Sequence, residues 1–146
     1  MHVMNRLRGF KAAVVLAAVL FTAGVASAAP TVTIDPNGDL NGPRTIATVS
    51  ITTQCTLGAS DTAAMTVYIL QPVGRVINIG IVNAVPTCDG ADHSLLVDVS
   101  AFQFMKFQPG PATVLVRIAI TGPDPADATK TVTTFSDFGA KVKLHP

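Results

Sequence analysis

The stretch TIATVSITTQC, from Thr45 to Cys55, alternates between two kinds of side chain. Polar Thr, Ser and Gln residues occupy one set of alternate positions, and mostly apolar residues ending at a cysteine occupy the other. A period of two, rich in β-branched residues, predicts a strand with one buried and one solvated face. The residues expected on the buried face are Ala47, Val49, Ile51, Thr53 and Cys55.

The chain begins with the pattern of a secretory signal peptide. Arg6, Arg8 and Lys11 precede an apolar run over residues 12–25, and Ala26-Ser27-Ala28 offers the small residues that signal peptidase recognises. The apolar run is shorter than the roughly 20 residues that a membrane-spanning helix needs, although an uncleaved anchor is the alternative. We therefore expect a signal-peptide helix over residues 1–28, one mature domain over residues 29–146 and a secreted, extracellular protein.

Cys55 and Cys88 are the two cysteines of the chain. An even cysteine count in an exported protein predicts a disulfide, which at this loop length is worth about 3–4 kcal/mol. The alternative, a thiol pair with a redox role, usually has a Cys-x-x-Cys spacing that the chain lacks.

Short alternating segments separated by turn residues continue to the end of the chain. We count seven to nine of them, and no amphipathic helix after residue 28, which predicts an antiparallel β-sandwich stapled by one disulfide. A small closed barrel is the alternative, because strand number alone does not separate the two. The apolar positions expected to face inward are Met65, Val67 and Ile69; Ile77, Ile79 and Ile81; Leu95, Val97 and Val99; and Val114, Val116, Ile118 and Ile120.

The order of motifs resembles a group of small exported proteins of actinobacteria. A strand ending in Cys55 and one ending in Gln71 are followed by Cys88-Asp89-Gly90 with His93, by FQPGPATV over residues 107–114, and by a late Val142-Lys143-Leu144. The resemblance covers nearly all of the mature chain, but Ser94-Leu95-Leu96 stands where that group commonly has an aromatic residue after the histidine. It implies a single immunoglobulin-like β-sandwich and an extracellular location, and it transfers no functional residue beyond the two cysteines.

The charge of the mature chain argues against two classes of partner. Without the three basic residues of the leader, seven Lys and Arg stand against nine Asp, and Glu is absent, so the formal charge is −2. Nucleic acids and anionic membranes are bound by clustered Lys and Arg. We therefore expect no nucleic-acid partner, and no membrane partner after signal cleavage.

The segment Asp35-x-Asn37-x-Asp39-x-Asn41 places oxygen ligands at alternate positions, as calcium loops do. An EF-hand needs Gly at its sixth position and Glu at its twelfth, where this chain has Leu40 and Ile46. We therefore interpret residues 35–42 as a turn between the first two strands, and we expect no metal and no cofactor.

Two histidines, His93 and His145, remain in the mature chain. Nucleophilic catalysis needs a base oriented by a carboxylate beside a Ser or Cys, and the chain has no G-x-S-x-G motif. Asp89 and Asp92 near His93 equally suit a turn, so we expect no catalytic residues and no enzymatic activity. An enzyme would require one of these histidines to bond an aspartate within a cleft.

The segment AFQFMKFQ, residues 101–108, brings three phenylalanines together. Phe102, Phe104 and Phe107 either fill the core or form an exposed apolar strip that contacts a partner, since apolar patches left in water usually mark contact sites. We expect a secreted, non-enzymatic protein that binds an unknown extracellular protein or surface. The alternative is an extracellular carrier of a small ligand or carbohydrate, with its pocket between the sheets or beside these phenylalanines.

Overall fold

The computed structural model describes residues 28–146, so the predicted signal-peptide helix lies outside the described residues apart from Ala28. No helix within this range is long and apolar enough to cross a membrane. The described chain is all-β, as predicted. Its seven strands are β1 (Thr31–Leu40), β2 (Ile46–Thr56), β3 (Thr62–Val73), β4 (Val76–Ala84), β5 (Asp89–Ser100), β6 (Gly110–Asp124) and β7 (Asp127–His145).

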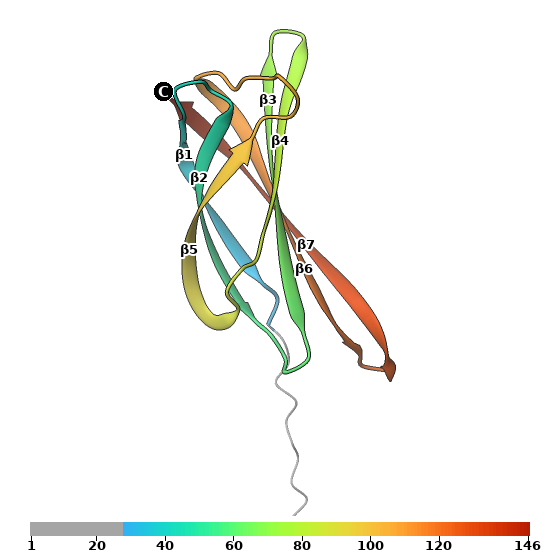
Figure 1. Cartoon of the computed structure of the whole chain (residues 1–146). Coiled ribbons are helices and arrows are strands. Elements are labelled where there is room, and N and C mark those ends of the chain that lie inside the picture. The colour runs from blue at the N-terminus through green and yellow to red at the C-terminus, as the bar shows by residue number, and fades with distance from the viewer. Residues whose placement is uncertain (1–27) are drawn as a thin grey trace, which may run out of the picture.

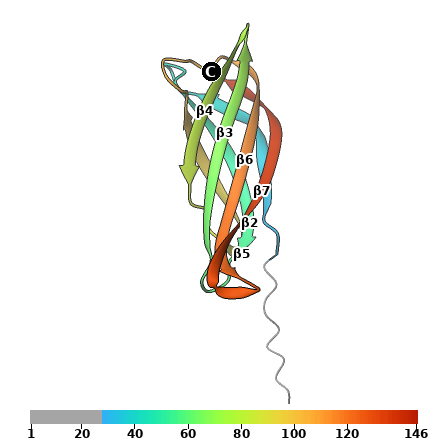
Figure 2. The ribbon, with the colours of Figure 1, turned by 90° about the vertical axis from the view of Figure 1, so that its right-hand side faces the viewer.

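The strands form one curled sheet in the order β4-β3-β6-β7-β1-β2-β5 (Figures 1 and 2). All neighbours are antiparallel except β1 and β7, which pair in parallel over three residue pairs, so the sheet is mixed and the expectation of a purely antiparallel one is corrected. The curling brings the two edge strands together at a bridge between Gly80 and Ala101. The strands therefore form one continuous sheet, folded over a single core, instead of two clearly separate ones.

Successive strands run in alternate directions, so the connections gather at two ends of the molecule (Figure 1). Residues 41–45, 74–75 and 101–109 and the C-terminus lie at one end. Residues 57–61, 85–88 and 125–126, together with Ala28–Pro30, lie at the other end.

The concave side of the sheet holds the core, and the alternation of β2 is confirmed there. The five predicted residues of β2 are buried, and so are the predicted inward residues of β3. In β6, three of the four predicted residues are buried and Ile120 is partly buried. Burying these side chains contributes about 1.5–3 kcal/mol for each large aliphatic residue.

Strand β4 has its faces reversed relative to the prediction. Ile77 and Ile81 are 55% and 49% exposed, whereas Asn78 and Gly80 are buried. The alternation of isoleucine was therefore read correctly as a strand but assigned to the wrong side. Leu95 of β5, also expected inside, is exposed at 39%, while Val97 and Val99 are buried.

Three segments differ from the expected boundaries. Residues 35–40 belong to β1, which continues through a bulge between Ile34 and Gly38, so the turn predicted for residues 35–42 is confined to residues 41–45. Residues 85–88 form a loop, and β5 begins at Asp89, so Asp89 and Asp92 belong to a strand although both also suit a turn. The C-terminal strand β7 is a single element of 19 residues.

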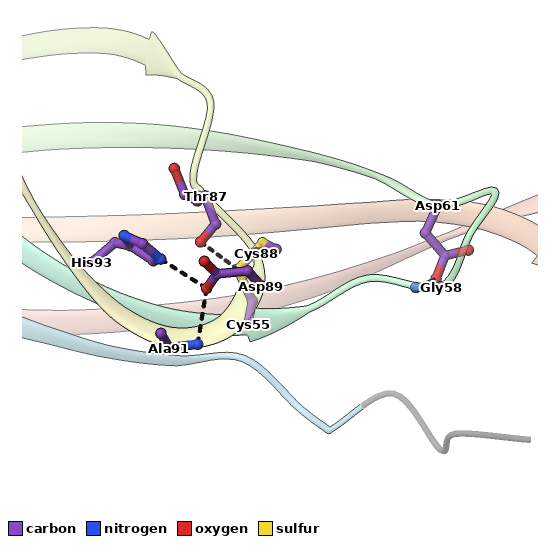
Figure 3. The surroundings of a disulfide bond; sticks show 8 residues. All are labelled: Cys55, Gly58, Asp61, Thr87, Cys88, Asp89, Ala91 and His93. Atoms are coloured by element: carbon purple, nitrogen blue, oxygen red, sulfur yellow. Dashed lines mark hydrogen bonds and ion pairs between the residues drawn. A yellow bond between two sulfur atoms is a disulfide. The ribbon is translucent and has the colours of Figure 1, made fainter.

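The disulfide is present between Cys55 and Cys88, 33 positions apart, with a Cα–Cα distance of 4.5 Å (Figure 3). It joins the end of β2 to the loop that precedes β5. Both cysteines of the chain are used in this bond.

Candidate functional site

The connection between β5 and β6, residues 101–109, is a long segment at the end of the molecule that also carries the C-terminus (Figure 1). It is named the aromatic loop below, because it contains Phe102, Phe104 and Phe107. Its first residues join the edge strand β4, since the Phe102 N–H donates to the Ile79 carbonyl at 2.7 Å. The loop thus begins on one edge of the curled sheet and returns to the middle of it through β6.

Two buried amide side chains hold the second half of the aromatic loop. The Gln71 amide donates to the Gln108 carbonyl at 2.6 Å and accepts from the Gln108 N–H at 2.7 Å. The Asn78 amide donates to the Lys106 carbonyl at 2.5 Å. Because Gln71 and Asn78 are both buried, these bonds replace water as partners of the loop backbone and fix its course.

Phe107 anchors the loop in the core. Its side chain has no exposed surface and is among the largest fully buried side chains of residues 28–146. Gly80 makes room for the ring, because a Cβ at this position would lie 2.8 Å from the Phe107 Cζ. The proposed contact role of Phe107 is therefore corrected: a buried ring is not available to a partner, and its place is structural.

Phe102 and Phe104 lie outside the core, as a contact surface requires. Phe102 is 54% exposed, and Phe104 is exposed to the full extent, at 106% of its reference area. The Met105 N–H donates to the Phe102 carbonyl at 3.3 Å, which closes a four-residue turn with Gln103 and Phe104 at its centre. The turn places the Phe104 ring at the tip of a loop whose base is tied to the core.

The backbone of this turn is unusual for the residues it contains. Gln103 and Phe104 have φ angles of 36° and 49°, the sign found at both central positions of a type I′ turn, where Asn and Gly are strongly preferred. A bulky residue in this region costs about 1–2 kcal/mol. Arg44, with φ of 62°, also lies at this end, and its carbonyl accepts from the Phe107 N–H at 2.9 Å. Strained residues in the described part of the chain therefore gather around the aromatic loop.

A second candidate site is a groove of about 500 Å³ on the convex side of β3, β6 and β7. Its floor is apolar, with Tyr68 and Leu70 from β3 and Leu115 from β6. Gly139 of β7 lies opposite Leu115 in the register and leaves space for its side chain. The groove is on the outside of the sheet, whereas the carrier pocket was expected either between the sheets or beside Phe102, Phe104 and Phe107, none of which lines the groove.

An ion pair closes one side of this groove. Arg117 donates to both carboxylate oxygens of Asp137, at 2.7 and 3.0 Å, and its guanidinium lies 5.4 Å from the centre of the Phe135 ring. The hydrogen bond from Arg117 lowers the pKa of the Asp137 carboxyl, and the same contact raises the pKa of Arg117. Both groups are in solvent, so this pair orients the two side chains more than it stabilises the fold.

The predicted catalytic candidate His93 does contact an aspartate (Figure 3). Its Nε2 lies 2.8 Å from Asp89 Oδ1, beside the disulfide. The Asp89 pKa is lowered, first by a hydrogen bond from the Ala91 N–H and then by His93. Ser94 follows His93 on the other face of β5, where it bonds Thr52 across the strands. The pair is solvent-exposed at the end of the molecule. It therefore provides the histidine–aspartate contact that an enzyme would require, but not its enclosure within a cleft.

The oxygen-rich segment of β1 uses its side chains locally. Asp35 accepts from the Asn37 N–H at 2.8 Å, the Asn41 carbonyl oxygen of the side chain accepts from the Ile46 N–H at 3.1 Å, and Asn37 lies 3.1 Å from His145. Within residues 28–146, no group of three or more His, Cys, Asp or Glu side chains could hold a metal ion.

Comparison of the chain with protein-family models, with curated proteins and with solved structures finds no match.

Proposed function

We propose that this chain is an exported, non-enzymatic protein that binds an extracellular protein or surface partner through its aromatic loop. The observation that carries the proposal is Phe104, a fully exposed aromatic side chain held at positive φ. Such a residue stabilises neither the core nor the turn, so folding alone gives no reason for it. Strained, exposed residues on a fixed base are typical of binding sites.

Rigidity of the loop favours a protein or surface partner. Because Gln71, Asn78 and Phe107 hold the base of the loop in the core, little conformational entropy is lost when its tip binds. Exposed aromatic side chains are the commonest anchors of protein interfaces. A flat or protruding apolar surface suits such a partner better than it suits an enclosed small molecule.

Export and an immunoglobulin-like fold belong to the same proposal. The leader pattern of residues 1–28 and the disulfide support an oxidising, extracellular location. The strand order can be divided into β1-β2-β5 and β7-β6-β3-β4, which three β1–β7 residue pairs and the Gly80–Ala101 bridge connect. We propose that these two parts correspond to the layers of an immunoglobulin-like sandwich, with strands A, B and E in one and G, F, C and C′ in the other. It supports kinship with the exported actinobacterial group.

The exposed setting of His93 and Asp89 supports a non-enzymatic role. Acyl transfer would need a nucleophile on the same side as the histidine, and Ser94 lies on the opposite face of β5. The two cysteines are joined to each other and supply no thiolate.

A carrier of a small ligand or carbohydrate is the second candidate, and one observation favours it. The outer groove combines an apolar floor of Tyr68, Leu70 and Leu115 with the polar pair Arg117 and Asp137. A ligand with one apolar face and several hydroxyl groups would match that combination. Chemical-shift changes confined to these residues upon addition of a sugar panel would support the carrier, and Tyr68→Ala is the variant that should abolish them.

A capture experiment with matched variants tests the main proposal. The protein is immobilised and exposed to culture medium and cell-envelope extract, and the retained proteins are identified by mass spectrometry. Phe104→Asn removes the ring and tolerates positive φ, so it should fold normally and lose the partner. Leu96→Asn, on an exposed residue in the middle of β5, should retain it. Equal capture by both variants would contradict the proposal.

A further inference from the structure

The two ends of the molecule carry charges of opposite sign. The connections at the end with the aromatic loop contain Arg44, Arg75 and Lys106, and the strand residues beside them add Lys141 and Lys143 as well as Asp39 and Asp98. This end is named the basic end. At the other end, named the acidic end, the connections and the strand residues beside them contain Asp61, Asp89, Asp92, Asp124 and Asp127. Lys130 is the one nearby cation in the described chain, and it is paired with Asp127 at 3.2 Å.

This separation is a property of the fold, because the charges alternate along the chain. Strands β1, β3 and β5 end at connections that contain Arg44, Arg75 and Lys106, whereas β2, β4 and β6 end beside Asp61, Asp89 and Asp124 at the opposite end (Figure 1). The formal charge of −2 on residues 29–146 therefore combines two surfaces of opposite charge at opposite ends of one elongated molecule.

The acidic end also contains an apolar pocket of about 350 Å³. The β6–β7 hairpin supplies Ile120, Pro123 and Val132, the segment before β1 supplies Pro30, and Asp61 also lines the pocket. Val132 is exposed, so the pocket wall is not part of the packed core. Its volume is at the lower end of the range of about 300–1,000 Å³ that small-molecule pockets show, which is enough for one aromatic side chain.

The basic end offers a side chain of matching kind. Phe104 protrudes fully from the aromatic loop, with Lys106 two residues further along. Phe104, with Lys106 two residues away, thus stands at one end, and an apolar pocket with Asp61 in its lining stands at the other. Both the shape and the charge are complementary between the two ends of the same chain.

We propose that the partner of the aromatic loop is a second copy of this chain, bound head to tail with Phe104 in the pocket between the β6–β7 hairpin and Pro30. This inference rests on the proposed function of the aromatic loop and names its partner. The contact is heterologous, because each copy contributes a different surface, so successive copies form an open chain unless rotation closes a ring.

The contact involves a loop tip and a small pocket, which makes it weak. Interfaces below about 1,200 Å² are usually transient, and dissociation constants in the micromolar range are expected. The charges at the rim should make the association faster and salt-sensitive, so raising the salt concentration from 50 mM to 500 mM should weaken it by about tenfold.

Two variants separate the two surfaces. Phe104→Asn removes the inserted side chain and suits the backbone of the turn. Val132→Arg fills the pocket and places a cation where the basic end would bind, on an exposed residue whose replacement leaves the core intact. Thr131→Arg, next to Val132 on the other face of β7, is the charge-matched control.

Sedimentation velocity on the protein recovered after export of the full-length chain tests the proposal between about 5 μM and 500 μM. The wild type and Thr131→Arg should form growing oligomers. Phe104→Asn and Val132→Arg should each be monomeric alone, and their mixture should form one-to-one dimers and nothing larger. This complementation is the signature of a head-to-tail contact.

Three results would overturn the inference. Self-association of Val132→Arg would show a head-to-head contact, and a wild type that stays monomeric at every concentration would show no contact. Binding of the monomeric wild type, but not of Phe104→Asn, to vesicles of anionic phospholipid would show a membrane as the occupant. If the wild type is monomeric but captures a protein that Phe104→Asn does not capture, the proposed function stands and only this inference fails.

Discussion

Truncation of Phe107 should destabilise the protein and disorganise the aromatic loop together. The ring is fully buried against Gly80, and Phe→Ala changes at such positions cost about 3–5 kcal/mol, because apolar contact is lost and a cavity is left behind. Against a typical total stability of about 5–15 kcal/mol, Phe107→Ala would remove about a fifth or more of the free energy of unfolding. The Phe104 ring, which does not touch the core, would lose its fixed position as a consequence.

Urea unfolding followed by circular dichroism measures this cost, because the transition of a single small domain is usually two-state. Phe102→Ala is the control: its side chain is more than half exposed, so the change should cost less than about 1 kcal/mol. Partner capture by Phe107→Ala should fall although Phe107 itself is buried. A cost below about 1 kcal/mol, or equal costs for the two variants, would refute the assignment of Phe107 as the anchor.

Three further predictions concern the disulfide, the loop support and the outer groove. Cys55→Ser should lower the free energy of unfolding by about 3–4 kcal/mol and leave one cysteine reactive to a thiol reagent, whereas unchanged melting would mean that the bond contributes nothing. Gln71→Ala should lower the free energy of unfolding in urea by about 1–3 kcal/mol, because two backbone groups of the loop lose their partner inside the protein. Gln71→Glu is a second variant for the same measurement, and unchanged stability of either variant would contradict that reasoning. Asp137 should titrate below its ordinary pKa of 3.8 in a carbon-detected NMR experiment, and Arg117→Gln should return it to normal. Because this pKa is lower in the folded than in the unfolded state, the pair supports folding above about pH 4 and loses that effect as the pH falls.

The sequence predicted the strands better than it predicted their faces. In β2, Ala47, Val49 and Ile51 alternate with Thr and Ser, so hydrophobicity and burial agree. In β4 they disagree, because Asn78 binds the loop backbone from inside and Gly80 makes room for Phe107. Both contacts join residues that are distant in the sequence, so the local alternation of side chains gives no information about either of them.

The same limit applies to the aromatic loop. The segment drew attention because three phenylalanines lie close together, and two of them are exposed. Their spacing alone could not show that Phe107 enters the core while Phe104 occupies a turn at positive φ. A residue pattern also could not bring Arg44, Arg75 and Lys106 to one end, since that clustering follows from the strand order. The signal in the sequence for the inward face of β4 was the pair Asn78 and Gly80, which alternate with the isoleucines of that strand.

The central claim is that Phe104 is retained for binding and contributes nothing to folding. Two measurements on Phe104→Asn test it, each compared with the wild type. One is the free energy of unfolding, and the other is binding of the partner, whether a captured protein or a second copy of the chain. For Phe104→Asn we expect a free energy of unfolding that is equal to that of the wild type or higher by up to about 1 kcal/mol, because Asn suits the turn, together with loss of binding. Reduced stability with binding intact would contradict it.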